Sequence, residues 1–598
     1  MLRTTSAIGL GLAALSPLAA QAQDSFLLDE LVASATLVPI EVNRTGTTVE
    51  TLDFGEIVEG GQSVGQTLSQ LPGVTVTANG GLGASSTVRL RGLGGSYIGV
   101  RIDGIDVTDP SGTQTSFNFG TLTAGLPGRI EVLKGTQSAL YGSNAIAGVV
   151  DITSWRPVDE GFSGQARVEG GSYGTGATTL NLGQVGERGE IALTLSHVTA
   201  DGFSARNTNS EDDGYDQSLM TLFAAFDATE NLRLGVSALW SDGTVEFDRA
   251  AADPSGEIDE TRKGLRAFAE LTTGAVDHEF AVSTVETERF DEGGFTERFV
   301  GERIKLEYLG AVDLDADLSL AFGADWTEET ATLDGASYDG ENGAVFGEVQ
   351  YAPTANLDLA LSLRYDSYSD FDDQATGRVA LAWRPREDVI VRAVLGTGYR
   401  APSLYERFGP FGNAALEPET SRSAELGIEK RYGSESFAKA TLFYTEIDDL
   451  IDFSGAAYAQ VPGTTNSKGI ELSGRYALND TVALTGAYTY TDAENSGDRL
   501  VRVPRHDFSL GLEAGLTDRL DGRLSLQTVA DRFDTNPFPA PPSDIADYTV
   551  VNAGLSYALT ETAEAYLRVE NLFDEDYEPV RGYNGAGRSL YVGLRASF

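Results

Sequence analysis

After about residue 157, apolar and polar residues alternate with a period of two, over segments longer than the strands of ordinary globular proteins. In the segment AEAYLRVENLF, Ala565 and Leu567 fall on one face, while Glu564 and Arg568 fall on the other. A face with a charged residue at every second position cannot pack into a dry core, because unpaired buried charges are costly. The pattern instead predicts a barrel whose outer face contacts lipid and whose inner face is wet.

Short polar turns recur along this region and indicate how many strands it holds. We count about ten of them, roughly every 40 residues, which suits two strands of about ten residues with one tight turn and one longer loop. That number of turns predicts an all-β, antiparallel transmembrane barrel of about 22 strands over residues 157–598. A barrel of this size has a lumen wide enough to need a plug.

The last segment, LYVGLRASF, supports closure of the barrel. Leu590, Val592, Leu594, Ala596 and Phe598 lie on one face. An open sheet edge in lipid would leave backbone groups without hydrogen-bond partners, so we expect the last strand to pair with the first. A soluble β-sandwich or propeller is the alternative, and it would need a second layer to bury this apolar face.

Residues 38–156 follow a different pattern, which mixes short strands with one short helix. The stretch SVGQTLSQLPG predicts a helix that Ser63 caps and that Pro72-Gly73 ends. Glycine-rich turns separate the strand-like pieces STVRLRG, YIGVRIDGIDV, GRIEVLKG and AGVVDITS. We therefore expect a compact α+β domain ahead of the barrel.

Residues 1–22 have the form of an export signal. Arg3 precedes an apolar run that is too short to span a bilayer, and Ala20-Gln21-Ala22 matches a small-residue cleavage site. The remaining chain holds no apolar run of about 18 residues, so we expect no transmembrane helix. The chain also holds no cysteine, which excludes disulfide and thiol chemistry.

Charge and histidine content exclude several function classes. The chain has 43 basic and 89 acidic residues, and its net charge of −46 repels nucleic acid. The three histidines, His197, His278 and His506, are widely separated, and no nucleophile–base pair, phosphate loop or metal cluster is recognisable. We expect no catalytic residues, no required cofactor and no enzyme activity.

Several stretches carry a family resemblance when they are taken in order. They are SVGQTLSQLPGVTV, STVRLRGLGGSYIGVRIDGIDV, IEVLKGTQSALYGSNAIAGVVDITS, GTGYRAPSLYERFGPFGNAALEPETSRSAELGIE, NSKGIELSG and VENLFDEDYEPVRGYNGAGRSLYVGLRASF. Together they resemble the TonB-dependent outer-membrane receptors over essentially the whole chain after the export signal. The resemblance implies a monomeric 22-stranded barrel in bacterial outer-membrane lipid, with an N-terminal plug. It also implies import of a scarce nutrient, driven by a TonB-type inner-membrane energy complex.

Within this family the chain is most similar to the cobalamin receptors. The plug begins almost directly after the export signal, the outer loops are short, and LPGVTVTANGGLGASSTVRLRG is close to the cobalamin-receptor plug. The resemblance therefore implies cobalamin as the ligand. A ferric-siderophore receptor is the alternative within the family, and a passive porin or surface-binding protein is the alternative outside it. A porin needs no N-terminal plug, so residues 36–155 argue against the porin.

The resemblance also implies that two plug loops, at about residues 79–86 and 107–115, face outward and contact the ligand. Their free backbone groups and hydroxyls suit a large polar ligand, although flexible turns of any function share this composition. The candidate ligand contacts are Asn79, Leu82, Ser85, Val107, Thr108, Asp109 and, in the barrel, Phe411.

Plug arginines and barrel glutamates are candidates for ion pairs that hold the plug in place. Arg89 and Arg91 fall on one face of STVRLRG, and the family's plug fold brings Lys134 nearby. Glu425 and Glu471 are the candidate partners on lumen-facing positions of the barrel. Wet-facing pairs would be individually weak and would let the plug move. The alternative is that each charge only faces lumen water.

The acidic loop NTNSEDDGYDQ is a candidate calcium site. It is no EF-hand, because Met220 stands where such a loop carries its bidentate glutamate. Cobalamin receptors bind calcium in this loop and the next, and Glu211, Asp213 and Asp242 match those liganding positions. A solvated acidic loop that serves only solubility is the alternative.

Residues 23–37, between the export signal and the plug, contain the short apolar segment DELVASATL. It is strand-like and has no evident neighbour to pair with in its own fold. The family places its energy-coupling segment, the TonB box, here, which implies that role for Asp29, Glu30, Leu31, Val32, Ala33, Ser34 and Ala35. An extended apolar peptide can add a strand to the sheet edge of a partner protein.

Overall fold

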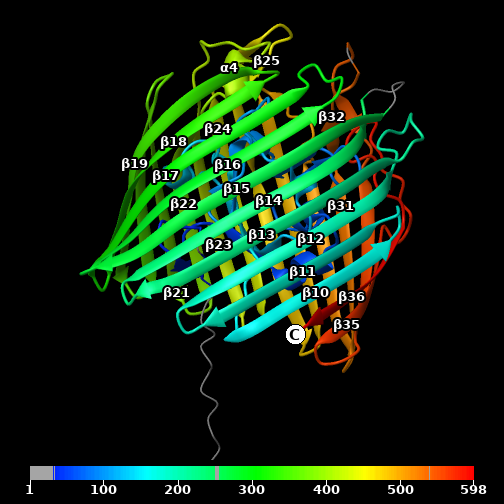
Figure 1. Ribbon diagram of the computed structural model, residues 1–598, viewed down its shortest axis with the longest axis horizontal. Coiled ribbons are helices and arrows are strands. Elements are labelled where there is room, and N and C mark those ends of the chain that lie inside the picture. Colours follow the sequence, from blue (N-terminus) through cyan, green and yellow to red (C-terminus); the bar gives the residue numbers. More distant parts are fainter. Residues whose placement is uncertain (1–30, 33, 250–254, 538) are drawn as a thin grey trace, which may run out of the picture.

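The computed structural model describes residues 31–32, 34–249, 255–537 and 539–598. Within these ranges, 22 long strands form a closed antiparallel barrel, as predicted (Figure 1). The barrel strands are β10 (Gly161–Gly171), β11 (Gly176–Gly186), β12 (Gly189–Phe203), β13 (Asp213–Thr229), β14 (Leu232–Asp248), β15 (Ser255–Thr273), β16 (Val276–Asp291), β17 (Arg298–Asp315), β18 (Leu318–Leu333), β19 (Ala336–Thr354), β20 (Leu357–Tyr368), β21 (Gln374–Arg386), β22 (Val389–Arg400), β23 (Glu419–Tyr432), β24 (Ser436–Asp448), β27 (Thr464–Asn479), β28 (Val482–Asn495), β30 (His506–Thr517), β31 (Leu520–Ala530), β34 (Tyr548–Ala558), β35 (Ala563–Glu570) and β36 (Ser589–Ser597).

Closure occurs between the first and the last strand of the barrel, because β10 pairs antiparallel with β36. The apolar face of β36 points outward, with Leu590, Val592, Leu594 and Phe598 each at least half exposed. The same alternation holds elsewhere: on β24, Leu442 is exposed while its neighbours turn inward. Among the described residues, no helix is both long and apolar enough to cross a membrane.

The two ends of the barrel differ. At one end, adjacent strands are joined by tight turns, which we call the short-turn end. Longer loops, some with secondary structure of their own, project from the other end, which we call the long-loop end (Figure 1). The loop elements are α4 (Leu404–Phe408), β25 (Ile451–Phe453), β26 (Tyr458–Gln460), β29 (Asp498–Arg499), β32 (Arg532–Asp534) and β33 (Ser543–Ile545).

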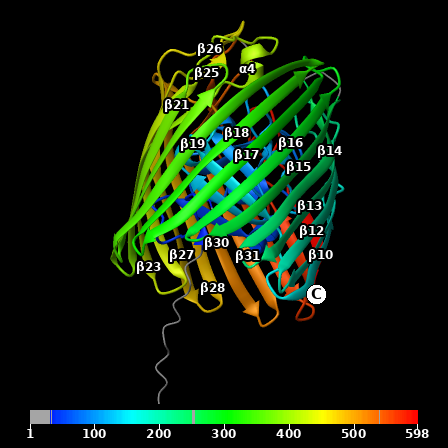
Figure 2. The same cartoon turned by 60° about the vertical axis from the view of Figure 1, so that its left-hand side comes forward.

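The N-terminal domain lies inside the barrel, where Figure 2 shows it in blue behind the green strands. Its central sheet has the order β3-β8-β9-β6-β7, and β4 and β5 form a separate hairpin. Its elements are β1 (Leu31–Val32), β2 (Ile40–Glu41), β3 (Val49–Asp53), α1 (Phe54–Glu59), α2 (Val64–Leu68), β4 (Val74–Ala78), β5 (Ser86–Leu90), η1 (Gly95–Tyr97), β6 (Ile98–Ile102), β7 (Ile105–Asp106), η2 (Phe119–Thr121), β8 (Pro127–Lys134), α3 (Ser138–Tyr141) and β9 (Gly148–Ser154). We call this domain the plug.

The plug's helices differ in part from the prediction. The predicted helix forms as α2, but Ser63 is its N-cap without a side-chain hydrogen bond. Helix α1 was not predicted, although its signal is present: Asp53 and Glu56 form a reciprocal capping box at its start. Valine, leucine and isoleucine side chains from both helices and from the central sheet bury one another in a single core.

Candidate functional site

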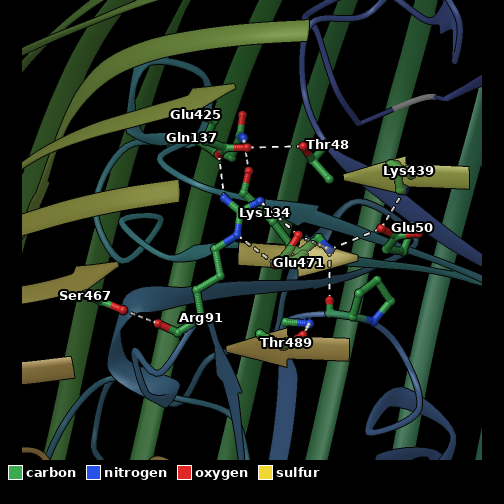
Figure 3. A network of polar contacts seen from close by, with 12 residues as sticks. Thr48, Glu50, Arg91, Lys134, Gln137, Glu425, Lys439, Ser467, Glu471 and Thr489 are labelled. Carbon is green, nitrogen blue, oxygen red and sulfur yellow. Dashed lines mark hydrogen bonds and ion pairs between the residues drawn. The ribbon is translucent and has the colours of Figure 1, made fainter. Parts of the chain in front are cut away.

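A cluster of buried charges joins the plug to the barrel wall (Figure 3). Arg91, just after β5, forms ion pairs with Glu425 on β23 at 2.7 Å and with Glu471 on β27 at 2.9 Å. All three side chains are at least 95% buried. Arg91 has φ +52°, and this left-handed turn directs its guanidinium out of the hairpin toward the wall. The sequence-predicted residues Arg91, Glu425 and Glu471 therefore lie together, but their ion pairs are buried and not wet-facing as predicted.

Lys134, at the end of β8, completes the centre of the cluster. Its Nζ donates to Glu471 Oε2 at 3.0 Å, to Glu50 Oε1 at 3.1 Å and to the Pro72 carbonyl at 2.9 Å. The side chain is completely buried. Three acceptors satisfy all three ammonium donors, so the buried side chain leaves no donor without a partner.

Glu50 and Lys439 extend the cluster to a further strand of the barrel, and the sequence analysis missed this contact. Glu50 on β3 accepts from Lys439 on β24 at 2.7 Å, and Thr48 donates to Glu425 at 3.1 Å. Lys439 lies on the inward face of β24, so the alternation of apolar and polar residues was enough to predict that its charge faces the lumen. The alternation does not identify Glu50 as its partner, because the two residues are 389 positions apart.

Two plug glycines make room for the barrel carboxylates. Gly73 has φ +72° and Gly135 has φ +78°, conformations that side chains rarely adopt. A Cβ at Gly73 would overlap Glu471 Oε1, and a Cβ at Gly135 would overlap Glu425 Oε1. Glycine is therefore required at both positions for the glutamates to reach Arg91 and Lys134.

The electrostatics of the plug groups match this geometry. Burial alone would raise the pKa of Glu50, but the ammonium groups of Lys439 and Lys134 outweigh it and lower the pKa to about 2. Burial also opposes the charge on Arg91, yet Glu425 and Glu471 raise the pKa of Arg91 above its ordinary value. Glu50 and Arg91 therefore stay charged at neutral pH and remain attracted to their partners on the barrel wall.

Arg89 does not belong to this cluster, which corrects the prediction that grouped it with Arg91. Its guanidinium donates to Thr77 Oγ1 at 2.7 Å, within the β4–β5 hairpin. The prediction assumed a regular strand, in which residues two apart face the same way. Arg91 instead lies past the end of β5 in a left-handed conformation, so the two arginines diverge.

The first predicted ligand loop, residues 79–86, is accessible at the long-loop end. Ser85 is exposed, and Asn79 and Leu82 are half-buried. The Asn79 backbone N–H donates to the Ser85 carbonyl at 3.0 Å, which closes the loop. Ser85 is therefore the candidate that a ligand entering from this end meets first, while Asn79 and Leu82 are partly covered.

The second predicted ligand loop, residues 107–115, is buried at its start and open at its tip, where Thr113 is exposed. Val107, Thr108 and Asp109 are each at least 94% buried. Arg303 on β17 donates to the Thr108 carbonyl at 2.8 Å, and Ser403 donates to the Thr113 carbonyl at 3.2 Å. The barrel wall therefore covers the candidates Val107, Thr108 and Asp109, and the tip at Thr113 is the accessible part of this loop.

Phe411 belongs to an aromatic cluster that the sequence analysis did not identify. Its ring stacks on Phe295 with centroids 5.1 Å apart and meets Phe453 edge-on at 5.4 Å. Phe453 in turn contacts Tyr458 at 5.7 Å. Three long loops supply these rings, and Phe295 is 75% exposed. The cluster presents an apolar surface at the long-loop end, where a ligand would first arrive.

The predicted calcium residues do not share one site, which corrects that grouping. Asp242 pairs with Ser218, five residues beyond Asp213 along β13. At about 3.3 Å per residue this separates Asp213 from Asp242 by roughly 16 Å, too far for one ion. Asp213 lies beside Asp248 instead, and Glu211 is on the preceding loop. Among the described residues, no group of three or more His, Cys, Asp or Glu side chains is arranged to hold a metal.

The N-terminal segment has a partner in its own fold, contrary to the prediction that it has none. Asp29, Glu30 and Ala33 lie outside the described residues, but Leu31–Val32 (β1) pairs antiparallel with Ile40–Glu41 (β2). The turn between the two strands folds the chain back on itself. Val32 and Ala35 are completely buried in a small apolar cluster with plug residues.

Polar contacts hold the same segment against the plug. The Ser34 backbone N–H donates to Glu131 Oε2 at 3.1 Å, and the Ser34 hydroxyl donates to the same oxygen. Tyr141 donates its hydroxyl to the Ser34 carbonyl at 2.7 Å. Burial raises the pKa of Tyr141 well above its ordinary value, so it keeps this proton. The segment is therefore docked on the plug, and its backbone groups at β1 and Ser34 already have hydrogen-bond partners.

Comparisons with known proteins cover both domains. The family model of the TonB-dependent receptor plug domain matches residues 41–149, and that of the TonB-dependent receptor-like β-barrel matches residues 154–572. The vitamin B12 transporter BtuB of Vibrio cholerae is 27% identical over 558 residues, and that of Photobacterium profundum is 26% identical over 553 residues. Both matches cover 89% of each chain. The solved siderophore receptor PirA from Acinetobacter baumannii has a TM-score of 0.79 at 17% identity, covering 92% of this chain and 98% of that one, which shows the fold alone.

Proposed function

The chain belongs to the TonB-dependent receptors of the bacterial outer membrane, and we propose that within this family it imports cobalamin. The observation that carries the proposal is the relationship to the BtuB transporters, which extends over 89% of both chains and so includes plug and barrel. The siderophore receptors share the fold at lower sequence identity, and a shared fold alone does not support a siderophore as the ligand of this chain. The family consists of receptors and transporters, and not of enzymes.

Ligand capture begins at the long-loop end. The exposed loop around Ser85 offers hydroxyl and backbone groups, and the aromatic cluster around Phe411 offers flat apolar surface. Cobalamin combines polar amide groups with a large flat ring system, so both kinds of surface suit it. The exposed tip of the second loop, at Thr113, adds to this contact surface.

Energy enters at the short-turn end through the N-terminal segment. A TonB-type partner would add this segment to its own sheet edge, which needs free backbone groups. In the docked state β2 and Glu131 occupy those groups. The segment must therefore leave β2 and Glu131 before the partner can pair with it, and ligand binding supplies the bias toward release.

Binding and uptake of cyanocobalamin test the proposal. Purified protein is expected to bind cyanocobalamin with a dissociation constant in the range of about 10⁻⁹ to 10⁻⁶ M, and to bind ferric enterobactin at least about a hundredfold more weakly. Cells that lack the gene should lose uptake of radiolabelled cyanocobalamin and regain it on complementation. Tight binding of the ferric chelate with no cyanocobalamin binding would replace cobalamin by a siderophore as the ligand.

A further inference from the structure

The barrel wall holds the plug with unequal strength around its circumference. Strands β23, β24 and β27, which we call the anchored wall, contribute Glu425, Lys439 and Glu471 to the buried ion cluster. Strands β28, β30, β31, β34, β35 and β36 form what we call the loose wall. Among the described residues, the ion pairs between the plug and the loose wall are those of Glu59 with Arg523 and Arg595, and the Glu59 side chain is 42% exposed.

Neutral hydrogen bonds hold the plug to the loose wall at mid-height. Gln527 on β31 donates to the Ser69 carbonyl at 2.9 Å and accepts from the Ser69 hydroxyl at 3.3 Å. Ser509 on β30 donates to the Gln70 carbonyl at 3.0 Å. Neutral hydrogen bonds are weaker than charge-assisted ones, and breaking them leaves no unpaired charge behind. The Ser69–Gln70 turn, which follows α2, is therefore weakly held.

A cavity of about 720 Å³, lined by both polar and apolar residues, lies between the plug and the loose wall at the short-turn end. Val58 and Glu59 at the end of α1 line one side, and Arg523, Ser556 and other residues of the loose wall line most of the rest, with Arg475 of the anchored-wall strand β27 at the border. Glu59 pairs with Arg523 at 2.8 Å across it, with both side chains about one-third exposed or more, and such pairs are weak. We call this cavity the vestibule.

One barrel strand connects the vestibule with the upper side of the Ser69–Gln70 turn. Arg523, Gln527 and Val529 all lie on the lumen face of β31. Val529 lines a small cavity of about 20 Å³ above the turn, together with plug residues 75–77. Six residues of strand span roughly 20 Å, so a displaced turn would join the two cavities along this face.

We propose that the solute crosses the barrel along the loose wall and that the Ser69–Gln70 turn is the gate. Opening breaks the neutral contacts with Gln527 and Ser509, while Arg91 and Lys134 keep their partners on the anchored wall. The plug therefore stays in the lumen during transport, and the vestibule receives a polar solute on its way out. This inference rests on the proposed import function.

The chain supplies a matched pair of glutamines for a test that needs no substrate. Gln217 on β13 contacts the plug through the same kind of bonds as Gln527, donating to the Thr121 carbonyl at 3.0 Å and accepting from Thr123 at 3.3 Å. In planar bilayers, Gln527→Ala is expected to raise the ion conductance of the purified protein at least about fivefold over the wild type, because it removes the gate's main contact. Gln217→Ala is expected to match the wild type. Equal conductance of the two variants would overturn the proposal.

Labelling of the vestibule tests the route itself, and the absence of native cysteine makes a single thiol unambiguous. Ser556→Cys lines the vestibule, and Ala352→Cys lines a separate cavity of about 360 Å³ at the same end, beneath β17–β21. A maleimide small enough to enter the periplasm modifies either thiol in cells. Modification of Ser556→Cys should lower uptake of radiolabelled cyanocobalamin at least about fivefold, by filling the vestibule.

Modification of Ala352→Cys should leave uptake as it was before labelling. Equal inhibition at the two positions, or inhibition at Ala352→Cys alone, would place the route elsewhere. Failure of wild-type cells to take up cyanocobalamin would refute the proposed function, and the bilayer conductance of the two glutamine variants would still decide the gate.

Discussion

Leu31→Pro is expected to abolish cyanocobalamin uptake while leaving cyanocobalamin binding within about twofold of the wild type. Proline lacks the backbone N–H and cannot take part in a strand ladder, so the N-terminal segment can no longer add to a partner's sheet. The lost hydrogen bond and the distorted strand each cost on the order of 1 kcal/mol or more, which predicts at least a tenfold fall in uptake rate. Radiolabelled uptake in cells and equilibrium binding to purified protein are the two measurements.

Leu31→Ala is the matched control, because alanine keeps the backbone donor. It should retain most of the uptake. The predicted ligand contacts lie on the far side of the plug from this segment, which is why binding is spared. Unchanged uptake with proline at this position would mean that the coupling segment lies elsewhere in the chain.

Arg91→Ala is expected to destabilise the plug within the barrel by about 3–5 kcal/mol, because it leaves Glu425 and Glu471 buried with less positive charge. Lys134 remains and neutralises Glu471 in part, but its three donors are already used by Glu471, Glu50 and the Pro72 carbonyl, so it does not replace Arg91 at Glu425. Urea titration in detergent, with protease resistance of the plug as the signal, measures the shift. The midpoint for loss of resistance should fall far below that of the wild type.

Arg89→Ala is the matched control for Arg91→Ala. The contact it loses is a hydrogen bond to Thr77 inside the plug, so the expected cost is about 1 kcal/mol. The double variant Arg91→Met/Glu425→Gln should be less destabilised than Arg91→Ala, since fewer charges stay unpaired. Equal small shifts for Arg89→Ala and Arg91→Ala would show that the ion cluster does not anchor the plug.

Local pattern was sufficient to predict the barrel, because lipid imposes a strict rule on every strand. Leu442 faces outward and Lys439 inward because each position must suit either lipid or the wet lumen. The outward face of β36 and its pairing with β10 follow from the same rule. The capping box of Asp53 and Glu56 was equally local, and the helix it starts could have been predicted from it.

The site was predicted less completely, because it depends on contacts between distant parts of the chain. Arg91 and Glu471 are 380 positions apart, and their pairing depends on a left-handed turn that the sequence pattern does not reveal. Thr108 is polar and near a turn, yet the barrel covers it. Ser34 binds Glu131 because the chain folds back between β1 and β2, and the sequence of a short apolar segment does not predict such a turn. In each case packing overrides a local expectation.

Above all, we propose that this receptor uses energy from the inner membrane to import its ligand through a plugged barrel. The most direct measurement is accumulation of radiolabelled cyanocobalamin by cells with and without a protonophore, alongside cyanocobalamin bound at the cell surface. The account predicts that the protonophore stops accumulation and leaves surface binding intact. Accumulation that continues unchanged in the presence of the protonophore would contradict it and would indicate a passive pore.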